Sequence, residues 1–210
     1  MNNFTRNDIE KMDKVKLLNL INSCRGYKSA NLIVTKSLLD VVNIAVFSTV
    51  THIGSNPPII GFITRSLTVN RDTNNNLKEN PFFTVNHITE NIISYAHHTS
   101  AGYDENISEF DKTNLEKEYK ETIEIPFVKN SPLQLLCKYV NQYHIAENDT
   151  VLIIATIENI FFERYLLHKD YCLQFDRAKV VTINDLDGYA LPLFIDGYAY
   201  ANQKYQLNHY

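Results

Sequence analysis

The sequence predicts a mainly β domain with flanking helices, and three features of the chain support this prediction. Residues 42–49 and 82–88 alternate between apolar and polar or small side chains, which is the period of a half-buried strand. Residues 133–145 and 151–162 give the longest strand signals. Residues 8–23 instead repeat apolar side chains at helical spacing.

Composition limits the size and the compartment of the protein. The 210 residues are 44% hydrophobic, which is enough to bury the core of one domain. A net charge of −4 gives no general attraction to nucleic acid or to a membrane surface. No apolar run approaches the roughly 20 residues that span a bilayer, and the polar N-terminus lacks the apolar segment of a signal peptide. We therefore expect a cytoplasmic protein that binds neither nucleic acid nor membrane.

Potential metal ligands are few and poorly spaced. Cys24, Cys137 and Cys172 are an odd number and lie far apart, which favours free thiols over a disulfide framework or a zinc site. His97 and His98 are adjacent, so on a helix their side chains point in different directions and do not readily share one metal ion. We predict no metal site.

The N-terminal segment 8–23 is expected to form one helix, capped by Asn7 or Asp8 and followed by Gly26. Its apolar residues predict a covering helix that packs on the body of the domain or on a partner subunit. They are Ile9, Met12, Val15, Leu18 and Ile21.

The centre of the predicted sheet consists of strands at 31–35, 42–49 and 59–63, with a rigid turn at Pro57-Pro58. One face of the middle strand carries small or polar side chains, so a flat ligand can approach the backbone closely. The residues on this face are Asn43, Ala45 and Ser48.

A candidate anion site follows these strands. Asp72 and Thr73 are good N-cap residues for a helix over 74–80. The start of a helix offers free amide groups and a positive dipole end, which favour a phosphate. Arg65 and Arg71 lie nearby in the sequence. The same residues are also compatible with ordinary surface and capping chemistry.

An ordered series of short motifs resembles the flavin reductase-like family of FMN-binding split barrels. The series covers roughly Ala30 to Glu163. It consists of Asn-x-Ala-x-Phe-Ser at 43–48, Asn-Pro-Pro-x-x-Gly-Phe at 56–62, Arg-Asp-Thr at 71–73, Phe-x-Val-Asn at 83–86, Ser-Glu-Phe-Asp at 108–111 and Ser-Pro-Leu at 131–133. The chain departs from the family pattern twice, because Val46 replaces the usual proline and Arg71 replaces the usual lysine.

The resemblance implies a split β-barrel that holds FMN. The backbone of 45–49 would bind the pyrimidine edge of the flavin, and Arg65, Ser66, Arg71 and Thr73 would hold its phosphate. The resemblance also places the residues after the helix at 89–96, around His98, near the flavin. The candidate cofactor-binding residues are Asn43, Ala45, Val46, Phe47, Ser48, Thr49, Arg65, Ser66, Arg71, Asp72, Thr73, Thr99 and Ser100.

The remaining segments complete the predicted domain. The charged stretch 103–124 is expected to be a solvated loop or helix face, although the resemblance makes it a gate beside the flavin, with Phe110 as an anchor. Residues 151–155 are nearly all apolar, which predicts a strand buried on both faces, and Glu158 is expected to face outward. In the tail we expect a short element at 179–183 and a turn at 187–189.

The chain is therefore expected to form a single domain over 1–210. Within it we distinguish a helix at about 8–23, a barrel core at about 30–163 and a C-terminal appendage at about 164–210. The aromatic residues of the appendage, in 191–200, could line a substrate pocket, seal a dimer interface or simply pack.

The resemblance implies an oxidoreductase in which NADH or NADPH donates a hydride to FMN. Because the cofactor supplies this chemistry, no dedicated catalytic acid or base is predicted. A homodimer is expected, with a small-molecule electron acceptor or a partner oxygenase downstream. Two alternatives stay open at this stage: an FMN-binding electron carrier or sensor without turnover, and a flavin-dependent oxidase of a small metabolite.

Overall fold

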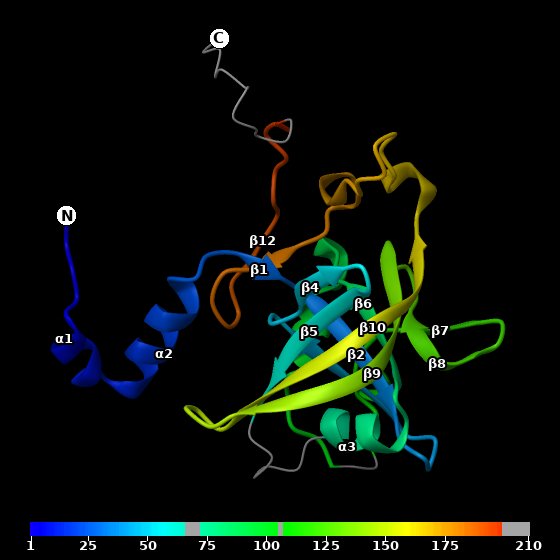
Figure 1. The fold of residues 1–210 in the computed structure, drawn as a ribbon, viewed down its shortest axis with the longest axis horizontal. Helices are drawn as coiled ribbons and strands as arrows, with labels where there is room; N and C mark the ends of the chain where they lie inside the picture. The colour runs from blue at the N-terminus through cyan, green and yellow to red at the C-terminus, as the bar shows by residue number, and fades with distance from the viewer. Residues whose placement is uncertain (66–71, 105–106, 199–210) are drawn as a thin grey trace.

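The fold was analysed in a computed structural model that describes residues 1–65, 72–104 and 107–198. Its body is a curled antiparallel sheet of seven strands, in the order β3-β2-β6-β9-β10-β5-β4 (Figure 1). The helices are α1 (Arg6–Glu10), α2 (Lys14–Ser23), α3 (Asp72–Glu79) and α4 (Ile93–His98), with short 3₁₀ helices η1 (Glu90–Ile92), η2 (Glu109–Lys112), η3 (Arg164–Leu166) and η4 (Phe175–Ala178). The strands are β1 (Lys28–Ser29), β2 (Asn31–Lys36), β3 (Val42–Phe47), β4 (Thr51–Ser55), β5 (Pro58–Thr64), β6 (Phe82–His87), β7 (Lys117–Lys120), β8 (Ile123–Val128), β9 (Leu133–Ile145), β10 (Thr150–Phe162), β11 (Thr182–Ile183) and β12 (Tyr189–Ala190).

Strands β9 and β10 hold the two halves of the sheet together. Each has 13 residues, and β9 also pairs with β6 while β10 also pairs with β5. The edge strands β3 and β4 do not pair with each other in the described part of the chain. The sheet is therefore an incompletely closed barrel.

The core consists of two apolar clusters on opposite faces of the sheet. Because side chains alternate along a strand, Leu32 and Val34 of β2 lie in the first cluster and Ile33 lies in the second. On β10 only one face is buried: Val151 and Ile153 point into the second cluster, whereas the side chains between them are half-exposed. The prediction that 151–155 is buried on both faces is wrong, since no element among the described residues covers the outer side of β10.

A small three-stranded sheet, β1-β11-β12, closes the first cluster at one end. Lys28 fixes it by donating to the backbone carbonyls of Asn22 and Asp185, at 3.1 and 2.9 Å. Tyr189 packs on the same cluster, and its burial raises the pKa of its hydroxyl to about 12. The element and turn expected near 179–183 and 187–189 are thus present, and residues 191–198 lead away from the barrel (Figure 1).

The N-terminal segment forms two helices rather than the one expected. Asp13 interrupts it, because its side chain accepts from the amides of Val15 and Lys16 and so begins a new helix. The first helix is capped by Thr5, not by Asn7 or Asp8. Neither helix buries a residue, and α2 stands apart from the sheet (Figure 1). The covering helix packed on the body of the domain is therefore not seen, and packing on a partner subunit stays a prediction.

Strand β4 and the hairpin β7–β8 were not predicted from the sequence. Strand β4 is mostly exposed, and the hairpin β7–β8 lies within the charged stretch that was expected to be a loop or helix. Lys120 holds this hairpin against the barrel, with its ammonium group 5.4 Å from the ring centroid of Phe127 and 5.0 Å from that of Phe161. No helix in the described residues is long and apolar enough to cross a bilayer.

Candidate functional site

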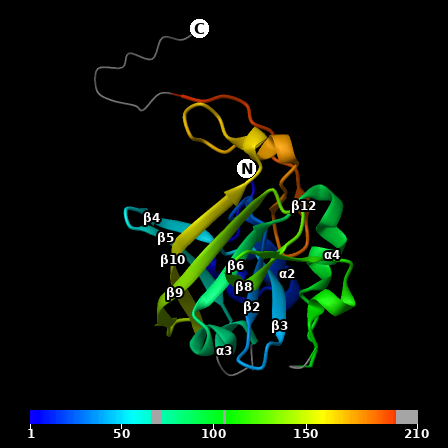
Figure 2. The same cartoon turned by 90° about the vertical axis from the view of Figure 1, so that its right-hand side faces the viewer.

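The free edge of β3 is the first component of the candidate site. Ile44 is paired with Val34 of β2, yet its N–H donates to the Glu109 carboxylate, with 2.9 Å between N and Oε2. The N–H of Ile44 therefore points away from β2. Since backbone direction repeats every two residues in an antiparallel strand, the N–H of Val46 points outward as well. Figure 2 shows β3 at this edge with α4 beside it.

Asn43 connects the edge strand to two other elements. Its Nδ2 donates to Oε1 of Glu109 at 3.0 Å, and its Oδ1 accepts from the hydroxyl of Thr73 at 3.0 Å. The side chains of all three residues are buried. The amide group of Asn43 is therefore already engaged, and its backbone, one residue before Ile44, faces β2. Its predicted contact with a cofactor stays a prediction.

Buried polar contacts fix α3 against the sheet. Asn74 donates to the hydroxyl of Thr64 at 3.1 Å, Asn76 donates to the hydroxyl of Thr35 at 3.0 Å, and Leu77 packs in the second cluster. The helix begins at Asp72, slightly earlier than predicted. Its first-turn amides have no acceptor within the helix, and the Asn74–Thr64 contact brings the exposed Arg65 close to them. This arrangement suits a phosphate.

The predicted ring-binding residues lie on β3 and directly after it. Ala45, Val46, Phe47, Ser48 and Thr49 are all half-buried. Val46 packs on the first cluster and Phe47 on the second, so both side chains belong to the core. Of the two, only Val46 turns its N–H toward the free edge. The Thr49 hydroxyl both donates to the carbonyl of Ile63 and accepts from its N–H, at 3.1 and 3.0 Å, so it anchors the loop to β5.

The last two predicted site residues, Thr99 and Ser100, follow α4 in the sequence. Thr99 is buried and its hydroxyl donates to the carbonyl of Ala96 at 2.7 Å, whereas Ser100 is exposed. The rings of His97 and His98 go to different partners, Tyr189 and Tyr103, as adjacent positions on a helix require. Ser66, Arg71 and the Asp72 side chain lie outside the described residues, so their predicted roles stay predictions.

Glu109 is the residue that the sequence analysis did not select. A single acid in a charge-rich stretch gives little signal, although its position between Ser108 and the buried Phe110 distinguishes it from the solvated acids nearby. Ser108 adds a buried hydroxyl oxygen without a hydrogen-bond partner among the described residues. The geometry therefore adds η2 to the walls of the site.

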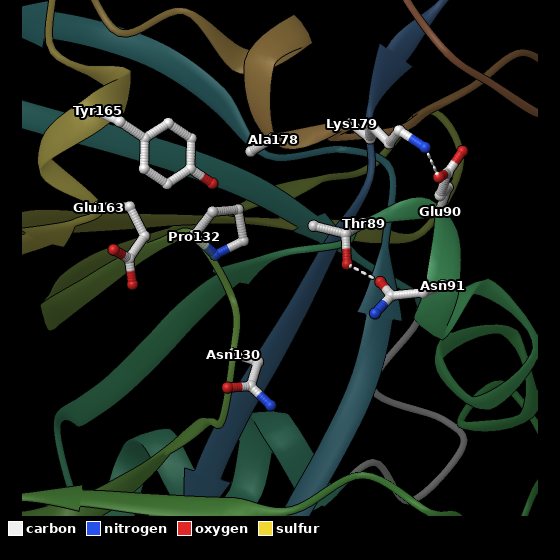
Figure 3. A pocket seen from close by; sticks show the side chains of 9 residues that line it. All are labelled: Thr89, Glu90, Asn91, Asn130, Pro132, Glu163, Tyr165, Ala178 and Lys179. Carbon is white, nitrogen blue, oxygen red and sulfur yellow. Dashed lines mark hydrogen bonds and ion pairs between the residues drawn. The ribbon is translucent and has the colours of Figure 1, made fainter.

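A separate pocket is lined partly by residues that follow the C-terminal end of β6. It contains none of the predicted site residues. Figure 3 shows the Tyr165 ring beside Pro132 on one wall and the ion pair of Lys179 with Glu90 on the opposite one. Its remaining lining residues are Thr89, Asn91, Asn130, Glu163 and Ala178. The candidate flavin site and this pocket are therefore distinct.

Comparisons with known proteins agree with the fold and the motif order. Residues 24–180 match the family described as flavin reductase like domain. A split barrel domain protein from Shewanella frigidimarina NCIMB 400, solved as a candidate flavin reductase, is 33% identical, with a TM-score of 0.91 over 96% of this chain and 100% of that one. No curated protein matches this chain by sequence.

More distant structures share the fold. Nitrilotriacetate monooxygenase component B from Bacillus cereus is 19% identical with a TM-score of 0.81, covering 94% of this chain and 98% of that chain. The NADH:FAD oxidoreductase of Streptomyces globisporus C-1027 is 12% identical with a TM-score of 0.66, covering 87% and 95%. The predicted split β-barrel with flanking helices is thus confirmed. The chain belongs to the flavin reductase-like domain family.

Proposed function

We propose that this chain binds FMN and reduces it with NADH or NADPH. The observation that carries the proposal is the outward-facing backbone of β3 beside the first turn of α3, in the segment that the family motifs assign to the flavin. The N–H of Val46 suits the acceptor atoms of a pyrimidine edge, and it is a donor that the proline usual at this position of the family does not have. Arg65 and the α3 amides suit an anionic phosphate. The donors present therefore fit a phosphorylated flavin.

When bound, the flavin supplies the redox chemistry by accepting a hydride equivalent from the nicotinamide. The residues of the chain bind, orient and shield it. The β3 backbone and the following loop would hold the ring edge, and Thr99 and Ser100 would close the site from the end of α4. Arg65, Ser66, Arg71 and the backbone N–H of Thr73 would hold the phosphate, because the Thr73 hydroxyl donates to Asn43. No proton transfer by a side chain is needed for hydride delivery, so the site requires no paired acid and base.

The electrons would leave to a small-molecule acceptor or to a partner oxygenase in the cytoplasm. The structural likeness to a monooxygenase component B supports an oxygenase partner. The likeness to an NADH:FAD oxidoreductase makes FAD the competing flavin. We also propose a homodimer, because apolar side chains are exposed on the outer side of the sheet, among them Ile53 of β4 at 47% and Tyr143 of β9 at 56%.

The experiment is spectroscopic. The purified protein, titrated with FMN, FAD and riboflavin, should show the bound oxidised flavin by bands near ~370 and ~450 nm. Stopped-flow mixing with NADH or NADPH should then bleach the ~450 nm band. Binding without bleaching by either nicotinamide would instead support an electron carrier or sensor. Fast bleaching by a small metabolite alone would support an oxidase, and no flavin binding at all would overturn the proposal.

A further inference from the structure

We propose that Glu109 is a positioning residue that makes the site select a phosphorylated flavin, an inference that rests on the proposed function. Glu109 is only 5% exposed although it is a carboxylate, and it accepts hydrogen bonds from the backbone of Ile44 and the side chain of Asn43. A buried carboxylate requires such partners. The Ile44 N–H and the Asn43 amide group both belong to β3, the strand that carries the candidate ring-binding segment.

The position of Glu109 is itself fixed from both sides along the chain. The neighbouring Phe110 is buried in the first core cluster, and the hydroxyl of Thr113 donates to the Glu109 carbonyl at 2.9 Å. The Asp111 N–H closes the turn on the Ser108 carbonyl at 2.9 Å. The carboxylate therefore reaches β3 from a rigid turn.

The chemistry of the carboxylate determines which way Asn43 faces. An ionised carboxylate only accepts hydrogen bonds, so Asn43 must turn its NH₂ group toward Glu109 and its carbonyl oxygen toward Thr73. This orientation makes the Thr73 hydroxyl the donor to Asn43. The contact holds the first turn of α3, where the phosphate is proposed to bind, at a fixed place beside β3.

Glu109→Gln tests this relay with almost no change of shape. In Glu109 the two carboxylate oxygens serve different donors, Oε1 for Asn43 and Oε2 for Ile44. A glutamine keeps an acceptor at only one of these positions and places an NH₂ group at the other, so Asn43 no longer has to turn its NH₂ group toward residue 109. We expect FMN affinity to fall by about 10-fold to 100-fold. Riboflavin, which lacks the phosphate, should bind within about twofold of the wild type. The FMN-to-riboflavin affinity ratio is the readout, because a general loss of structure would lower both affinities together.

Two further variants make the result decisive. Asp111→Asn removes the same charge from an exposed position in the same 3₁₀ helix, and it should leave the ratio unchanged. Asn43→Ala breaks the relay in the middle while Glu109 keeps its Ile44 contact, and it should lower the ratio as Glu109→Gln does. If Glu109→Gln is not recovered in folded form, the FMN-to-riboflavin affinity ratio of Asn43→Ala tests the relay instead.

The outcomes separate this inference from the proposed function. A wild-type protein that prefers FMN, combined with variants that keep the same preference or lose both flavins equally, would overturn the role of Glu109 alone. A wild-type protein that binds FMN no better than riboflavin would overturn the phosphate site itself.

Discussion

The ring of Phe47 meets the ring of Phe62 edge to face, with centroids 5.2 Å apart and planes at 74°. Phe62 meets Phe83 in the same way at 5.6 Å and 64°. Three aromatic rings thus connect the candidate flavin segment to the second core cluster.

This chain of rings predicts coupled stability losses. Phe62→Ala should cost about 3–5 kcal/mol of unfolding free energy, because Phe62 is fully buried. Phe47→Ala should cost less, since Phe47 is half-buried. Urea unfolding of both single variants and the double variant should show a coupling of about 0.5–1.5 kcal/mol. Phe194→Ala, in the exposed tail, is the control, and strict additivity of Phe47→Ala and Phe62→Ala would contradict the contact.

The orientation of the β3 backbone predicts opposite tolerance for proline at two adjacent positions. Val46→Pro removes an N–H that points away from the sheet and introduces the residue usual in the family, so the fold should persist and flavin affinity should fall by no more than about twofold to tenfold. Ala45→Pro removes an N–H that faces β2, so it should destabilise the protein strongly. Thermal unfolding and flavin titration separate the two effects. Equal tolerance at both positions would show that the assigned direction of the strand is wrong.

The phosphate assignment predicts a loss that depends on charge. The double variant Arg71→Ala with Thr73→Ala should weaken FMN binding by at least about tenfold, because a charge-assisted hydrogen bond is worth roughly 1.5–3 kcal/mol. Fluorescence titration measures the change. Arg6→Ala, whose side chain pairs with Glu10 in α1, should have no effect. Unchanged FMN affinity in the double variant would refute the assignment.

His87 predicts how stability depends on pH. Burial lowers the pKa of His87 from 6.5 to about 4, and its ring is stacked on Phe175 with centroids 5.1 Å apart. Between these two pH values the unfolded chain binds a proton that the folded chain does not. The His87 contribution to stability should therefore fall as pH decreases through this window, by up to about 3 kcal/mol.

Urea unfolding at pH 6.5 and pH 4 checks this expectation. His87→Phe keeps an aromatic ring against Phe175 but removes the titration, so its stability should depend less on pH than that of the wild type. His52→Gln, at an exposed position on β4, serves as the control. The same pH dependence in His87→Phe and the wild type would exclude His87 as the source.

The proposed homodimer predicts that one surface substitution separates the subunits. Ile53 lies on the outer face of the sheet over Gly61, where a Cβ would come within 3.3 Å of its Cδ1. Ile53→Asp places a charge on this apolar surface and should shift the protein to monomer in light scattering. Tyr119→Asp, at a 58% exposed position on β7, should leave the assembly unchanged. A wild-type monomer, or a dimer that tolerates Ile53→Asp, would contradict the proposed interface.

Local patterns predicted the main strands because the alternation along β3 and β6 reflects the two faces of the sheet. The break between α1 and α2 at Asp13 was missed because the apolar residues keep their helical spacing across it. The Asp13 side chain nevertheless caps a new helix there. Hairpin β7–β8 was missed because β7 is rich in charge and because the hairpin is held partly by Lys120 over the ring of Phe161, which lies far along the chain on β10. The contact of Glu109 with Ile44 joins residues that are far apart in the sequence, so the sequence around either residue does not predict it.

A strand at the edge of a sheet has unpaired backbone groups on one side, and these can pair with a strand from another molecule. At the open edge of β3, a strand from another molecule would have to displace Glu109 from the Ile44 N–H, which would cost a buried carboxylate one of its hydrogen bonds. The contact that orders the site therefore also resists end-to-end growth of the sheet into larger aggregates.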